Sequence, residues 1–199
     1  MPLETFLALS GFAIAASLSP GPNNMMVFAS GVNFGYVRSL PHICGIAAGF
    51  AFLLACVGAG LGALLTAFPA LFVATKFAGG AYLVWIAWKI ATTRSMGEGR
   101  ADIDGRPLTF LQAAAFQWVN PKAWIMGMTA MALYTSPSAY VSSVAMVAGF
   151  FGFVSLFSVS VWAGFGSALS QWLAHPTRLK IFNIAMAILL VASLWPMLR

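Results

Sequence analysis

Long apolar stretches separated by short polar breaks make up most of this 199-residue chain. The breaks divide the chain into six apolar segments, at about residues 4–32, 40–66, 69–91, 109–134, 139–168 and 178–197. A membrane-spanning helix needs about 20 mostly apolar residues, and each segment provides about that many. The pattern predicts an all-α integral membrane protein with six transmembrane helices. The alternative is five, because the fourth segment contains the charged residue Lys122.

Composition supports a membrane protein and argues against two other classes. The chain is 61% hydrophobic and 7% charged, whereas soluble domains carry about 25% charged residues. Its ten basic residues are scattered singly, so no cluster is available to follow a nucleic-acid backbone. A cleaved signal peptide begins with basic residues, whereas the N-terminal residues here include Glu4 and no Lys or Arg. We therefore expect the first segment to stay as a membrane span.

A hydrophilic loop at about residues 92–108 divides this single membrane domain into two similar halves, residues 1–91 and 109–199. Each half has a segment broken by proline, then a glycine-rich segment, then a plainer third one. Because three is an odd number, the second half would start on the opposite membrane face. The sequence predicts two inverted three-helix repeats, an architecture common in secondary transporters, with the first and fourth helices broken.

The distribution of basic residues predicts the orientation of the six spans. One set of connections carries seven basic residues, Arg38, Lys89, Arg94, Arg100, Arg106, Arg178 and Lys180. The opposite set carries two, Lys76 and Arg199. Cytoplasmic loops are enriched in Lys and Arg, so both chain termini should lie outside.

The first break consists of Pro20, Gly21 and Pro22, followed by Asn23 and Asn24. Proline lacks an N–H and clashes with the preceding helical turn, so the helix must end there. In a bilayer the freed backbone groups are tolerated only where protein or a wet cavity satisfies them. A new helix could start just past Pro22 with Asn23 or Asn24 near its cap, and its positive end would suit a carboxylate. The alternative is an ordinary kink.

The second break, in the fourth segment, contains Gln117, Asn120, Pro121 and Lys122. Asn120 is a candidate helix cap, Pro121 a first helical residue and Gln117 a hydrogen-bond donor. A charge at mid-membrane costs about 2.5–3.5 kcal/mol, so Lys122 is expected to be functional. It would be a fixed cation for a substrate carboxylate or a group that changes protonation during transport. The alternative is that Lys122 extends to the membrane surface.

The positions of the few acidic residues limit which groups could couple transport to an ion. All four lie at Glu4 or in the hydrophilic loop, so no carboxylate is available inside the membrane to bind sodium or relay protons. Coupling to an ion would then use Lys122, a histidine, backbone carbonyls or the substrate. His42 is expected at the membrane interface without a ligand role. We expect no metal and no cofactor, and interpret the two breaks as a site for a carboxylate-bearing solute.

Three motifs together resemble the LysE/RhtB family of bacterial amino acid exporters. They are the Pro-Gly-Pro-Asn-Asn motif of the first break, Ala-Gly-Gly-Ala-Tyr-Leu-Val-Trp at 78–85 with Trp-Lys at 88–89, and Gln-Trp-Val-Asn-Pro-Lys-Ala-Trp at 117–124. They occur in the family's order and are spread over most of the chain. The first motif and Ala-Trp-Lys-Ile at 87–90 look most like the cysteine/O-acetylserine exporter branch.

The resemblance implies a secondary transporter in the bacterial inner membrane that exports small neutral amino acids or their derivatives in exchange for protons. The substrates would be cysteine- and O-acetylserine-like, or homoserine- and threonine-like. The expected partners are the substrate, protons and the lipid bilayer, with a homodimer as one candidate assembly. Two alternatives are a membrane-embedded enzyme, which would normally need a cluster of His, Asp, Glu or Cys, and a passive pore for small polar solutes.

Overall fold

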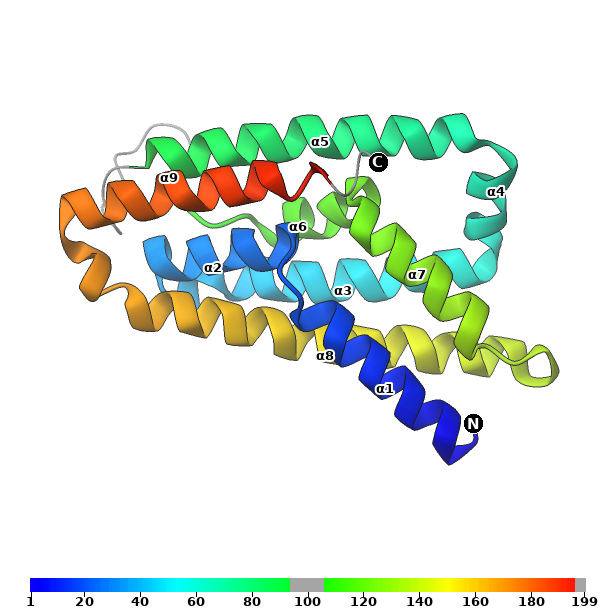
Figure 1. Cartoon of the computed structure of the whole chain (residues 1–199). Coiled ribbons are helices and arrows are strands. Elements are labelled where there is room, and N and C mark those ends of the chain that lie inside the picture. Colours follow the sequence, from blue (N-terminus) through cyan, green and yellow to red (C-terminus); the bar gives the residue numbers. More distant parts are fainter. Residues whose placement is uncertain (94–105, 196–199) are drawn as a thin grey trace.

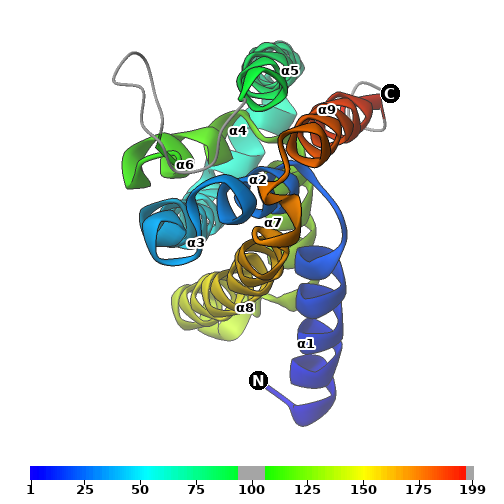
Figure 2. The same cartoon turned by 90° about the vertical axis from the view of Figure 1, so that its left-hand side faces the viewer.

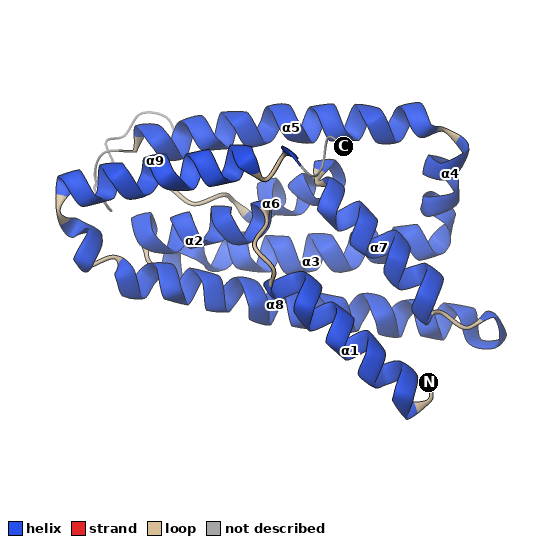
Figure 3. Cartoon of the chain, in the orientation of Figure 1, coloured by secondary structure: helices blue, strands red, loops and turns tan. Residues whose placement is uncertain are grey.

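The computed structural model describes residues 1–93 and 106–195, and within these ranges it contains helices and connecting segments but no strand (Figure 3). The α-helices are α1 (Leu3–Leu18), α2 (Pro22–Phe34), α3 (Leu40–Cys56), α4 (Gly62–Ala67), α5 (Pro69–Thr92), α6 (Phe110–Phe116), α7 (Pro121–Tyr134), α8 (Tyr140–Leu169) and α9 (Pro176–Ala192). Short helical turns are η1 (Val37–Ser39), η2 (Val57–Leu61), η3 (Gln117–Val119), η4 (Pro137–Ala139) and η5 (Trp172–Ala174). Most of the predicted loop at 92–108, and the end of the sixth segment, lie outside the described residues.

Two helical stretches, Val37–Leu61 and Pro137–Leu169, are long and apolar enough to cross a membrane. The pair α1 and α2, which meet at an angle of 54°, makes a third candidate if it counts as one span. The helices occupy the regions of the predicted apolar segments, and both proline motifs interrupt helices. The all-helical, membrane-type fold is therefore confirmed, while the six-span inverted repeat stays a prediction.

The second predicted segment, residues 40–66, is not one straight helix. Gly60 has φ of +112°, a backbone conformation that favours glycine because it has no Cβ. The chain turns there, and α4 connects α3 to α5 across one end of the bundle (Figure 1).

Helix α2 lies at the centre of the bundle. In the view along the bundle (Figure 2), α3, α8 and α9 surround it, and α5 lies beside α9 on the outside. Nine of the 13 residues of α2 are buried. Because α2 starts at the first break, this arrangement places that break in the protein interior.

Two glycines allow α2 and α8 to approach each other closely. A Cβ on Gly31 would collide with the backbone carbonyl of Ala163 in α8, and a Cβ on Gly166 would collide with the carbonyl of Phe28 in α2. Small residues at helix contacts are a common way of bringing backbones together in membrane proteins. The glycine-rich character of α8 therefore has a packing role.

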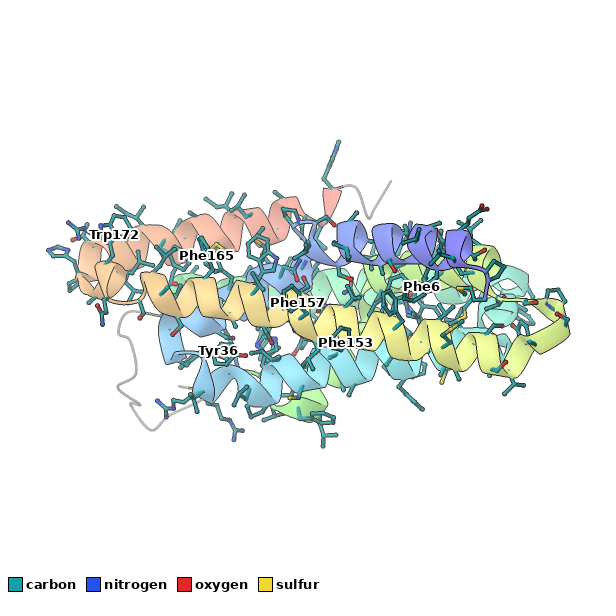
Figure 4. All side chains as sticks on the ribbon, turned by 90° about the horizontal axis from the view of Figure 1, so that it is seen from below. Phe6, Tyr36, Phe153, Phe157, Phe165 and Trp172 are labelled. Carbon is teal, nitrogen blue, oxygen red and sulfur yellow. The ribbon has the colours of Figure 1, made fainter. Side chains whose placement is uncertain are left out.

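The outer face of α8 is aromatic and exposed. Phe153, Phe157 and Phe165 are 68%, 62% and 66% exposed, and they lie along the helix in the view of Figure 4. Their spacings of four and eight residues put them on one face. The opposite face packs in the core through residues such as Val147 and Phe151. A helix that is apolar on all sides suits a position between a protein core and lipid.

We predict that Gly166→Ala and Gly164→Ala change stability in opposite directions. The Cβ at residue 166 meets the Phe28 carbonyl, and such overpacking costs about 1–3 kcal/mol. Residue 164 is two positions away in the same helix and faces open space, so alanine should stabilise it by about 0.5–1 kcal/mol. Thermal unfolding of the purified variants in detergent measures both. Equal effects of the two substitutions would contradict close α2–α8 packing at Gly166.

Candidate functional site

The first break leaves carbonyl groups at the end of α1 that the side chain of Asn24 satisfies. Helix α1 ends at Leu18 and α2 begins at Pro22. Asn24 Nδ2 donates to the carbonyls of Ser17 at 2.8 Å and of Ser19 at 3.0 Å. The expected cap role of Asn23 or Asn24 is wrong, because Gly21 occupies the N-cap position and no side chain caps α2. Asn24 instead binds the carbonyls that precede α2, across the break.

The second break follows the prediction closely. After α6 and η3, Asn120 caps α7, its Oδ1 accepting a hydrogen bond from the Lys122 amide at 3.1 Å. Pro121 occupies the first helical position, where its missing N–H is not needed. Trp124 Nε1 donates to the Trp118 carbonyl at 2.8 Å, which fastens the new helix to the turn before it.

Lys122 joins the two breaks. Its Nζ donates to Ser19 Oγ at 2.8 Å and to the Ser19 carbonyl at 3.0 Å, across 103 positions of sequence. The lysine side chain therefore lies against the first break. A Cβ on Gly21 would come within 2.9 Å of Lys122 Nζ, so glycine there makes room for the ammonium group.

A second pair of contacts crosses between the same two breaks. Asn23 Nδ2 donates to Gln117 Oε1 at 2.9 Å, and Gln117 Nε2 donates back to Asn23 Oδ1 at 3.1 Å. Gln117 is fully buried and its Nε2 also reaches the Ala113 carbonyl at 3.0 Å. This reciprocal amide pair fixes the relative position of α2 and η3.

The junction carries a positive charge whose partners are neutral. Among the described residues, Lys122 Nζ has only the Ser19 hydroxyl and carbonyl as hydrogen-bond acceptors. Glu4 lies at the far end of α1, roughly 22 Å away at 1.5 Å per residue. The positive ends of α2 and α7 also meet here, because both helices begin at the breaks. An anionic group would find complementary charge at this junction.

A small cavity of about 30 Å³ lies at the junction. Its lining residues include Ser17, Gly21, Asn23, Asn24, Asn120, Lys122 and Ser155. Ser17 Oγ is buried and has no hydrogen-bond partner among the described residues. About 10–15 Å³ of such cavity volume is enough for one water, so the cavity has room for about two waters and not for an amino acid.

The structure brings most of the predicted site residues together. Five of them, Gly21, Asn23, Asn24, Asn120 and Lys122, line the cavity, and Gln117 is bonded to one of these. Pro20, Pro22 and Pro121 do not line it, and they shape the breaks instead. Sequence reasoning missed Ser17 and Ser155. Ser17 could have been found from its position just before a break, whereas Ser155 lies in the uninterrupted helix α8.

The environment of His42 is the protein interior. His42 is fully buried in α3, with its Nδ1 3.0 Å from Ser30 Oγ of α2. Helix α3 packs on α8 and α6, and its His42 faces Ser30 of α2, which the apolar sequence around it did not indicate.

Known proteins match the chain over nearly its full length. The sequence model of the family described as LysE type translocator matches residues 14–193, a range that includes both breaks. The chain belongs to the LysE family of translocators. Cysteine/O-acetylserine efflux proteins of Escherichia coli (strain K12), Shigella sonnei (strain Ss046) and Shigella flexneri are each 30% identical over 182 residues, which cover 90% of this chain and 90% of each relative. No solved structure matches the chain.

We predict that Asn23 and Gln117 are energetically coupled. Asn23→Ala leaves the buried Gln117 without its Asn23 partner, Gln117→Ala leaves the partly buried Asn23 without its partner, and the double variant removes both amides. Two hydrogen bonds of about 0.5–1.5 kcal/mol each imply a coupling free energy of about 1–3 kcal/mol. A double-mutant cycle, measured by denaturant unfolding in detergent micelles, determines it. The control cycle pairs Asn23→Ala with Gln171→Ala, an exposed site, and should be additive.

Proposed function

We propose that this LysE family member is a secondary exporter of small neutral amino acids or their derivatives, which it exchanges for protons. The substrates proposed are cysteine- and O-acetylserine-like, as the names of the relatives suggest, or homoserine- and threonine-like. One observation carries the proposal: Lys122 of one helix break is hydrogen-bonded to Ser19 of the other, beside a small polar cavity.

The chemistry of Lys122 supports a substrate with a carboxylate. A partly buried ammonium group held by neutral oxygens gains a stronger ionic hydrogen bond when a carboxylate replaces them. The amides of Asn120 and Asn24 lie beside it and offer further polar contacts. A zwitterionic amino acid supplies the carboxylate without adding net charge to the membrane interior.

The size of the cavity supports alternating access. At about 30 Å³ it must enlarge before an amino acid binds, so the two halves have to move apart at the junction. In Figure 1, α1 and α2 run along the bundle in one direction and α6 and α7 in the other. This opposite course supports two inverted halves that rock about the breaks, as in other transporters with inverted repeats.

The ends of the helices support the proposed orientation. Helices α2, α5 and α8 end, and α3 and α9 begin, at the same end of the bundle (Figure 1). The basic residues Arg38, Lys89, Arg178 and Lys180 belong to these turns and helix ends. We assign this end to the cytoplasm, which puts both termini outside.

Transport by purified protein in liposomes tests the proposal. With an imposed pH gradient, the protein should accumulate labelled cysteine, O-acetylserine, homoserine or threonine above equilibrium. Lys122→Ala should reduce the rate to background, because it removes the cation at the junction, without reducing the amount of protein in the membrane. Lys180→Ala, at an exposed position of α9, should transport at about the normal rate.

Each other outcome has a distinct meaning. Equilibration without accumulation would indicate a passive pore. Chemical conversion of the solute would indicate an enzyme. Full transport by Lys122→Ala would remove the proposed site.

A further inference from the structure

A second, larger cavity lies between the central site and the end of the bundle that we assign to the cytoplasm. Its volume is about 90 Å³, and α2, α3, α5 and α6 contribute its lining. From α2 come Met26, Ala29, Ser30 and Asn33, whose spacings of three and four residues put them on one face. Asn23 lies three residues before Met26 on that face. The cavity therefore follows α2 away from the amide pair of Asn23 and Gln117.

The charge of this cavity suits an anionic group. Among the described residues that line it are two cations, Lys89 and Arg106, and no Asp or Glu. Lys89 Nζ also lies 4.0 Å from the centre of the Trp85 ring, which holds the end of its side chain at the cavity wall. An amino acid arriving from the cytoplasm would meet the Arg106 guanidinium with its carboxylate.

A buried polar pair forms the inner part of the lining. Ser30 Oγ lies 3.0 Å from His42 Nδ1, and the two residues are 7% and 0% exposed. His42 Nε2 is buried and has no hydrogen-bond partner among the described residues. Leaving a buried polar atom without a partner is unfavourable, so a ligand that supplies one is favoured. The pair can therefore form a further hydrogen bond beside this cavity. It takes no part in the central site.

We propose that this cavity is a loading site, which binds the amino acid substrate from the cytoplasm before it reaches Lys122. The Arg106 guanidinium binds the carboxylate, and the Ser30–His42 pair binds polar groups at the other end of the solute. The Asn23–Gln117 pair lies between this loading site and the central cavity and has to open for the substrate to pass. The inference rests on the proposed export function.

Sided transport kinetics test the loading site. Everted membrane vesicles present the cytoplasmic face to the added solute, and right-side-out vesicles present the opposite face. The probe is the best transported of labelled cysteine, O-acetylserine, homoserine and threonine. For Ser30→Ala we expect KM in everted vesicles to rise about five- to tenfold, the loss of about one hydrogen bond, with KM in right-side-out vesicles within twofold of normal.

Matched variants and controls keep the result interpretable. His42→Gln should give the same one-sided rise, and Ser10→Ala, an exposed serine of α1, should change neither KM. A C-terminal tag checks the orientation of the vesicles. Added protease should remove it from right-side-out vesicles and not from everted ones. Equal changes of KM on both faces, or none on either, overturn the loading site. Absence of transport by the unmutated protein in either vesicle type would overturn the proposed function instead.

Discussion

Two helix breaks in the middle of an apolar bundle have to satisfy each other's polar groups. The carbonyls of Ser17 and Ser19 have lost their helical donors, and lipid offers none. Asn24 and Ser158 donate to the Ser17 carbonyl, and Lys122 and Asn24 donate to that of Ser19. These contacts hold the two halves against each other and keep α2 at the centre. The close glycine contacts between α2 and α8 follow from this position.

The same contacts give the junction its chemical character. Hydrogen bonds from a charged group contribute about 1.5–3 kcal/mol each, so separating Lys122 from Ser19 has a cost of a few kcal/mol. Under the proposed function, a substrate carboxylate would offset that cost by providing a better acceptor for the ammonium group. Binding and separation of the two halves are then linked, since the solute replaces the contacts that close the site. This link is what an exporter needs and a permanently open pore does not.

The sequence predicted the breaks and the second helix cap, because Pro22, Asn120 and Pro121 act through local backbone chemistry. It could not predict that Asn24 turns back to α1, or that Asn23 pairs with Gln117 across 94 positions, since both depend on how the halves meet. The burial of His42 could not be predicted for a different reason. The helices are apolar on nearly every side, so no polar face in the sequence indicates which side of α3 points inward.

The central claim is that the junction of the two breaks binds a carboxylate at Lys122. Equilibrium competition between a labelled substrate amino acid and its unlabelled methyl ester, on purified protein, tests this claim most directly. The ester keeps the amino group and side chain but lacks the negative charge. The account predicts that the ester competes at least tenfold more weakly than the free amino acid, and that Lys122→Ala reduces this difference. Equal competition by ester and amino acid on the unmutated protein would contradict it.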